Sequence, residues 1–270
     1  MAWAMSLGVL SVGAVPASTA AAEAPNRARA EAEAVATAPE ATDGRASASE
    51  ATDRPTPASE AVIQLAGWVL SSRDNNRLPF VIIDKVRAEV FVFGADGQLS
   101  GSAPALLGLA HGDDSVPGIG EKELSKIPPE ERTTPAGRFL AGYGQGAESD
   151  ILWVDYDTAV SMHQVVTTNP KEQRLHRLET PIPDDNRITF GCINVPVAFY
   201  QGIVLPTFTG TKGVVYILPE SKPLEEVFLN YRPQERQVAG LAAATGQEAD
   251  VSEASAPGPA GGFPGISNAH

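Results

Sequence analysis

The segment from residue 23 to residue 60 is the feature that most limits how this chain can fold. It holds a single valine, Val35, and no leucine, isoleucine, methionine or aromatic residue. Such a segment cannot bury enough apolar surface to offset the entropy that ordering removes. The same character returns after about Arg232. We therefore predict one folded domain, residues 61–225, between a disordered linker, residues 25–60, and a disordered tail, residues 226–270.

The first 24 residues are apolar and end in small residues. The run "MAWAMSLGVLSVGAVPASTAAAEA" closes with Ala-x-Ala patterns, which indicate a secretory signal peptide cleaved near Ala22 or Ala24. The basic residues that usually precede the apolar run are missing, so the true start stays open, and a membrane anchor is the alternative. We expect an exported protein of the periplasm or cell envelope, with no membrane span after removal of the signal.

Composition and charge narrow the choice of partners. The 270 residues are 43% hydrophobic and carry a formal net charge of −13. The sequence has no basic stripe, so we expect no nucleic-acid partner. The stretch "HGDDS" offers His111, Asp113 and Asp114, but consecutive acids lack the alternate spacing of a calcium loop. We interpret them as solvated loop residues, and we predict no metal, no cofactor and a monomer.

Short β-rich runs dominate the predicted domain. Two of them, residues 79–85 and 88–94, are followed by the hairpin pair Asp96-Gly97. Further β-branched and aromatic runs, bounded by turn residues, lie at 99–110, 150–157, 158–165 and 212–220. Helical spacing favours one short helix over 61–72 and another within 195–204. Strands without regular intervening helices predict a mainly β, sandwich-like fold.

The single cysteine, Cys192, lies in "ITFGCINV". Cysteines of exported proteins usually pair, and one cysteine cannot pair within its own chain. It is therefore part of an intermolecular disulfide, an inert buried thiol or a reactive nucleophile. Gly191 allows the backbone to approach a substrate closely, and a helix beginning after Cys192 would favour a thiolate at its positive end.

A reactive thiol needs a partner, because a free cysteine has a pKa of about 8.5. His163 ends "TAVSMH", whose alternation indicates a strand that would hold the ring rigidly. His176 lies in the charged stretch "KEQRLHRLE", which is typical of a surface helix or loop. We prefer His163 as the base and keep His176 as the alternative.

The order of these motifs resembles the L,D-transpeptidase catalytic domain. "TTPAGRF", residues 133–139, is followed by a strand ending in histidine, then by "TFGCINV" and a last strand "KGVVYIL". That family carries a Thr-Pro-x-Gly-x-Phe turn, a strand-borne histidine and a Ser/Thr-His-Gly-Cys box. The resemblance spans roughly residues 78–219, close to the whole predicted domain, and implies that family's catalytic fold.

The resemblance also implies a catalytic role for four residues. Cys192 would be the nucleophile and His163 its general base. The backbone amides of Gly191 and Cys192 would donate to the oxyanion. The third partner of the histidine would be a backbone carbonyl, here that of Gln164.

Five further residues are candidates for contacts with the substrate. Asn194 matches the family's Asn/Arg position, and Thr189 matches its Ser/Thr position. The aromatic rings of Trp153, Tyr156 and Phe190 are candidates to line a substrate groove, although core packing is the commoner role for each. The turn Thr134-Pro135-Ala136-Gly137 would shape the wall beside it.

The chain departs from the family pattern in three ways. Phe190 stands where the family usually has histidine, and Gln164 replaces the common glycine after the catalytic histidine. The distance from His163 to Cys192 is longer than usual, and that from His176 is nearer the usual value. We interpret residues 164–187 as an inserted loop. Within it "TPIPDDN", residues 180–186, is built for a defined turn, and it is either a lid over the cleft or a plain surface loop.

Such a site would perform acyl transfer without a metal or organic cofactor. The resemblance implies attack of Cys192 on a peptidoglycan stem peptide, with a thioester that passes to an amine, which is L,D-transpeptidation. Transfer to water instead would make the protein an L,D-carboxypeptidase. The departures at Phe190 and Gln164 favour a third possibility, a non-catalytic cell-envelope binding domain that has kept the fold.

Overall fold

The computed structural model describes residues 57–144 and 151–232. The predicted signal peptide, nearly all of the predicted linker and most of the predicted tail lie outside the described residues. Among the helices that are described, none is both long and apolar enough to cross a bilayer.

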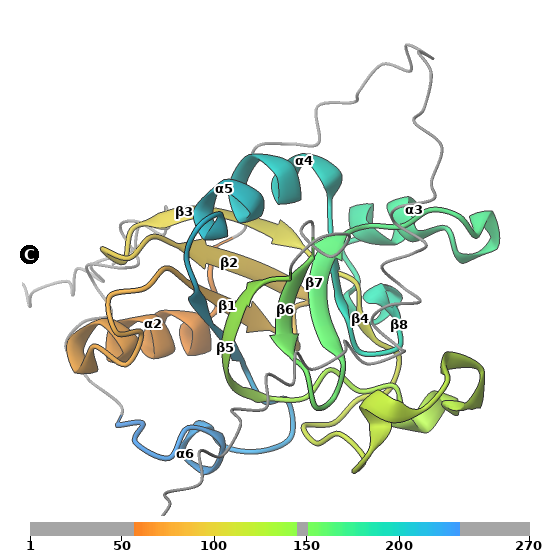
Figure 1. Ribbon diagram of the computed structural model, residues 1–270, viewed down its shortest axis with the longest axis horizontal. Helices are drawn as coiled ribbons and strands as arrows, with labels where there is room; N and C mark the ends of the chain where they lie inside the picture. Colours follow the sequence, from red (N-terminus) through yellow and green to blue (C-terminus); the bar gives the residue numbers. More distant parts are fainter. Residues whose placement is uncertain (1–56, 145–150, 233–270) are drawn as a thin grey trace, which may run out of the picture.

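Eight strands form one mixed sheet, in the order β3-β2-β1-β10-β5-β6-β7-β9 (Figure 1). Most neighbours are antiparallel, but β1 pairs with β10 and β7 pairs with β9 in parallel. A separate parallel pair, β4 and β8, joins β9 through a bridge between Leu106 and Asn194. The prediction of a mainly β fold with short helices is confirmed. The strand bounds are β1 Phe80–Asp84, β2 Glu89–Phe93, β3 Leu99–Pro104, β4 Leu107–Gly108, β5 Gly137–Tyr143, β6 Leu152–Asp155, β7 Val160–Gln164, β8 Arg187–Thr189, β9 Ile193–Val195 and β10 Gly213–Ile217.

The longest described helix, α2 (Glu60–Ser72), begins where the Ser59 hydroxyl accepts a hydrogen bond from the Val62 amide. It ends at Arg73, which adopts the left-handed conformation that commonly terminates helices. The predicted helix after Cys192 is present as α4 (Val197–Phe199) and α5 (Leu205–Phe208), joined by a π-helical turn. The remaining α-helices are α3 (Arg174–Glu179) and α6 (Leu224–Val227), and 3-10 turns lie at Ile119–Glu121, Leu124–Lys126, Pro129–Glu131, Pro170–Glu172 and Pro183–Asn186.

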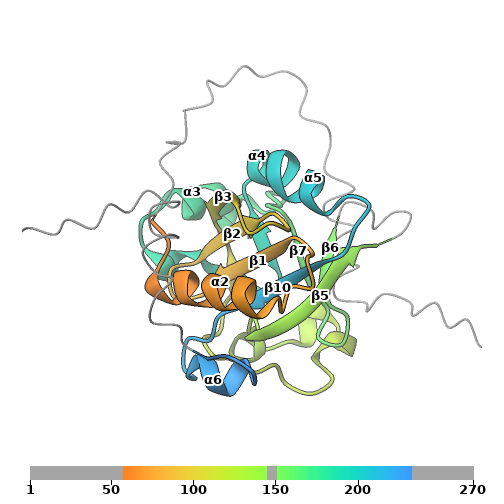
Figure 2. The ribbon, with the colours of Figure 1, turned by 90° about the vertical axis from the view of Figure 1, so that its left-hand side faces the viewer.

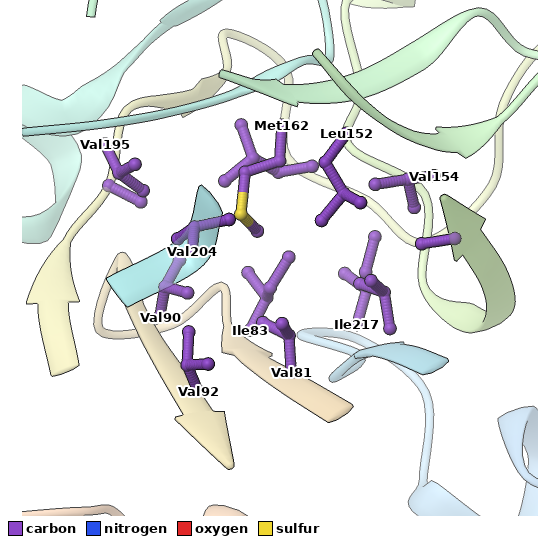
Figure 3. Packing of buried hydrophobic residues seen from close by; sticks show 14 of the residues in the cluster. Val81, Ile83, Val90, Val92, Leu152, Val154, Met162, Val195, Val204 and Ile217 are labelled. Atoms are coloured by element: carbon purple, nitrogen blue, oxygen red, sulfur yellow. The ribbon is translucent and has the colours of Figure 1, made fainter. Parts of the chain in front are cut away.

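Side chains alternate between two cores on the two faces of the sheet. In β1, Val81 and Ile83 join the core that α4 and α5 cover, which also receives side chains from β2, β6, β7 and β9 (Figure 3). Phe80 and Ile82 point the other way and pack against α2. Figure 2 shows α2 and the α4–α5 segment over different parts of the sheet. Both faces are therefore buried, which explains the nearly continuous apolar runs of β1 and β10.

The predicted domain boundary at residue 225 is too early. Phe228 and Tyr231 are buried in the α2 core, and the Trp68 indole donates to the Asn230 carbonyl at 3.1 Å. The rings of Trp68 and Tyr231 meet edge to face, with centroids 5.8 Å apart. The side chains of Phe228 and Tyr231, with Val227 packed partly against the same core, thus hold residues 226–232 against the domain.

Candidate functional site

The candidate site lies on paired strands β7 and β9. Met162 pairs with Ile193 and His163 with Asn194, in parallel register. Met162 and Ile193 point into the main core. Because side chains alternate along a strand, His163 and Asn194 lie on the opposite face of the sheet. Two residues earlier in the chain, Ser161 in β7 and Cys192 just before β9 lie on that same face and contact each other.

The sulfur of Cys192 is fully buried. The Ser161 hydroxyl donates to it at 3.5 Å, and the sulfur lies 3.7 Å from the Ala159 carbonyl oxygen, within reach of a weak S–H hydrogen bond. Of the three alternatives for this cysteine, the intermolecular disulfide is incompatible with this conformation, because a sulfur with no solvent exposure cannot meet a second chain. An inert thiol and a nucleophile that becomes exposed on substrate binding remain.

The Gly-Cys turn is held by two threonine hydroxyls. Gly191 has φ +129°, a conformation that favours glycine. The Thr189 hydroxyl accepts from the Gly191 amide at 3.1 Å and donates to the Cys192 carbonyl at 2.7 Å. The Thr134 hydroxyl donates to the Gly191 carbonyl at 2.9 Å and accepts from the Gly108 amide at 2.8 Å. The "TTPAGRF" turn therefore clamps the cysteine turn directly.

These bonds correct two expectations. Thr189 is buried and braces the turn, so its side chain is not available to a substrate. The Gly191 amide already donates to Thr189, so it cannot donate to an oxyanion in this conformation. Sequence position identified both Thr189 and Gly191, but only the folded turn shows that they hydrogen-bond to each other.

The imidazole of His163 is buried and has a neighbour at each ring nitrogen. Its Nδ1 lies 2.8 Å from the carbonyl oxygen of Gln164, the backbone partner that the resemblance implies. Its Nε2 lies 3.2 Å from the side-chain nitrogen of Asn194. His176, the alternative base, is exposed on α3. His163 is thus the histidine that shares a sheet face with Cys192.

The predicted groove aromatics have different environments. Trp153 is only 1% exposed and packs with Ile151 and Ala159, so in this conformation it has the core-packing role and not the substrate contact. Its ring stacks on that of Tyr156, which is 46% exposed, with centroids 4.8 Å apart. Phe190 is half-buried beneath the Arg132 guanidinium, 4.0 Å above the ring centroid. Alternation alone could not decide which face of β6 Trp153 occupies.

A buried ionic cluster near the site was missed by sequence reasoning. Lys85 is completely buried, and its ammonium donates to Asp113 at 2.8 Å and to the Thr134 carbonyl at 3.0 Å. Arg187 donates to Glu220 at 2.6 Å, and Glu220 lies 3.7 Å from the Lys85 ammonium. Asp113 is therefore not the solvated loop residue that we expected. We call Lys85, Asp113, Arg187 and Glu220 the ionic cluster.

Hydrogen bonds keep the carboxylates of the ionic cluster charged. Burial alone would raise the pKa of Asp113, but donors from Lys85, Ser221 and backbone amides lower it well below its ordinary value. Burial likewise opposes ionisation of Glu220, but the Gly112 amide, His111 and nearby cations lower the pKa of that group. Because the Thr134 carbonyl belongs to this cluster and its hydroxyl to the cysteine turn, the two networks meet at one residue.

Comparisons with known proteins leave the family of the chain open. No family model matches it, and no curated protein matches it. A solved structure, a mutant of the helical cell shape determining protein Pgp2 from Campylobacter jejuni, is similar at 13% identity with a TM-score of 0.35. The match covers 70% of this chain and 62%, less than two thirds, of that chain. The function must therefore be argued from the chain's own residues.

Proposed function

We propose that this protein is an exported cysteine acyltransferase that acts on peptidoglycan stem peptides, with Cys192 as nucleophile and His163 as general base. The observation that carries the proposal is the placement of sulfur and imidazole on one face of the paired β7 and β9 segments, two residues apart in register. The Gln164 carbonyl on the imidazole Nδ1 is the third element of a nucleophile–base–orienter arrangement. The substrate class comes from the resemblance to L,D-transpeptidases.

The reaction would proceed in two halves. His163 Nε2 takes the proton of the Cys192 thiol, and the thiolate attacks an amide carbonyl of the stem peptide. Collapse of the tetrahedral intermediate breaks the amide bond, and protonated His163 gives its proton to the leaving amine. An incoming amine then loses a proton to His163 and attacks the thioester, which releases Cys192. Water in place of that amine would give carboxypeptidase activity.

Burial of the sulfur adds a requirement. A substrate carbonyl has to come within about 3–3.5 Å of the attacking atom. Since Cys192 has no exposed surface, the site must open when the stem peptide binds. The resting structure would then be a closed state in which Ser161 and the threonine-braced turn hold the thiol in place.

The test is acylation by a tetrapeptide-stem muropeptide, followed by intact mass. We expect a thioester adduct on the wild-type protein, none on Cys192→Ala, and at least about 100-fold slower formation with His163→Ala, because a general base contributes ~10²–10⁴. His176→Ala is the matched control and should acylate normally. Loss of acylation with His176→Ala alone would contradict the assignment of the base.

Complete burial of Cys192 specifically favours a second candidate, a non-catalytic envelope-binding domain. Iodoacetamide distinguishes the two at neutral pH. A non-catalytic domain should be alkylated only as fast as it unfolds, with or without muropeptide. The proposed enzyme should be alkylated faster when a non-cleavable stem peptide holds the site open.

A further inference from the structure

A chain of hydrogen bonds runs from α3 to the candidate base. Arg174, the first residue of α3, donates from Nη1 to Oδ1 of Asn194 at 2.7 Å. The side-chain nitrogen of Asn194 lies 3.2 Å from His163 Nε2, and His163 Nδ1 lies 2.8 Å from the Gln164 carbonyl oxygen. Glu172 holds the Arg174 guanidinium in turn through an ion pair. We call this series the Arg174 relay.

The hydrogen-bonding chemistry of the two ends of the relay fixes the orientation of the Asn194 amide and the position of the proton on His163. A guanidinium can only donate, so Asn194 must present its oxygen to Arg174 and its NH₂ group to His163. A backbone carbonyl can only accept, so His163 must carry a proton on Nδ1. Nε2 faces the NH₂ donor and is therefore the unprotonated nitrogen. This is the tautomer that a general base needs.

We propose that Arg174 is a positioning residue, which orients the Asn194 amide and thereby keeps His163 Nε2 free of a proton in the resting protein. Without the guanidinium, the amide can rotate and offer its oxygen to Nε2, which would stabilise a proton there. The catalytic consequence rests on the proposed function, but the protonation of Nε2 does not. Asn194, which is fully buried, then acts between the two side chains.

The proposal also gives a role to the segment that we interpreted as an inserted loop. Arg174 brings that segment into contact with the residue beside the base, so the segment is tied to the candidate site. A second arginine of α3, Arg177, stabilises the segment itself. Its Nε donates a hydrogen bond to the Glu172 carbonyl at 2.8 Å, and its Nη1 donates to the Asp185 carbonyl. Arg177 thus provides a matched control that stabilises the same segment without reaching Asn194.

The test is the nitrogen NMR spectrum of ¹⁵N-histidine-labelled protein, with the His163 signals assigned by their absence in His163→Ala. In the wild type we expect Nδ1 to be protonated and Nε2 to have the shift of an unprotonated ring nitrogen. Arg174→Ala should place a proton on Nε2 in a larger fraction of molecules at the same pH. Asn194→Asp, whose carboxylate can only accept, should do the same. Arg177→Ala should leave both signals unchanged.

Two results would overturn the proposal. One is an unchanged Nε2 signal in both Arg174→Ala and Asn194→Asp, and the other is an equal change in Arg177→Ala, which would show that only the order of the segment matters. Acylation assays separate this proposal from the proposed function. If the NMR changes occur but no variant, including wild type, forms a thioester, the relay stands and the enzyme assignment fails. If wild type and Arg174→Ala acylate equally fast, with unchanged spectra, the relay fails and the enzyme assignment stands.

Discussion

Two buried polar networks lie side by side in this protein, and they are built on opposite principles. The ionic cluster joins two cations to two carboxylates, and it holds the end of β1, the loop after β4 and the chain after β10 together. The group formed by Ser161, His163, Cys192 and Asn194 is built from side chains that carry no permanent charge. Thr134 contacts both networks.

The difference shows what each network can do. Charges in a dry interior are tolerated only when they are paired and hydrogen-bonded, so the ionic cluster resists rearrangement and fixes the loops around the site. A thiol and an imidazole can exchange a proton without leaving an uncompensated charge behind. The rigid network supports the turn that carries Cys192, and the neutral one is suited to chemistry.

Removing the cation at the centre of the ionic cluster should have the largest effect on stability. Lys85→Met leaves Asp113 without its buried cation and Glu220 with Arg187 alone, and we expect the free energy of unfolding to fall by about 3–5 kcal/mol. Urea denaturation followed by circular dichroism measures the loss. The control is Lys222→Met, which removes only a pair with the exposed Asp114 and should leave the free energy of unfolding nearly unchanged. Equal losses in the two variants would show that burial of the pair is irrelevant.

Acid should weaken the same cluster. The lowered pKa values of Asp113 and Glu220 lie below those of an unfolded chain, about 3.9 for Asp and 4.3 for Glu, so the unfolded state takes up protons first as the pH falls. Their contribution is therefore constant from neutral pH to about pH 5 and is lost below about pH 4. The urea midpoint of the wild type, measured from neutral pH to about pH 3, should fall only below about pH 5. The midpoint of Asp113→Asn should fall less steeply over the same pH range. A midpoint that is unchanged at about pH 3 would contradict this account.

The residue shared by both networks should show an intermediate effect. Thr134→Val leaves the Gly108 amide and the Gly191 carbonyl without their buried partner, which should cost about 1–3 kcal/mol. Acylation of Cys192 should also slow, because the turn that presents it is no longer clamped. Thr133→Val is the control, since among the described residues the Thr133 hydroxyl has no hydrogen-bond partner. Normal stability in Thr134→Val would mean that the clamp is dispensable.

The smallest effect on stability is expected inside the neutral network. Ser161→Ala removes the hydroxyl that donates to the Cys192 sulfur, at a cost of about 0.5–1.5 kcal/mol. A thiolate gains more from that donor than a thiol does, so acylation should slow several-fold while folding is nearly preserved. Single-turnover acylation and urea denaturation of the same samples measure both. A large loss of stability with normal acylation would assign Ser161 to packing instead.

The elements of the neutral network were predictable, and the ionic cluster was not. Period-two alternation around Met162 indicated the strand that carries His163, and the glycine before Cys192 indicated the turn. The partners of Asp113 are the side chain of Lys85 and the backbone after Glu220, which lie far from it in sequence and meet it only through the β1–β10 pairing. The role of Arg174 could not be predicted for a related reason. Its charged stretch is typical of a solvated surface, and only the fold places its guanidinium against Asn194.

The most direct test of the account locates the acyl group after a single turnover with a tetrapeptide-stem muropeptide. Acid-quenched wild-type protein is digested with trypsin and mapped by mass. The account predicts a hydroxylamine-sensitive adduct on the peptide that contains Cys192, together with release of the terminal amino acid. A folded wild-type protein that stays unmodified, or an adduct that persists in Cys192→Ala, would contradict it.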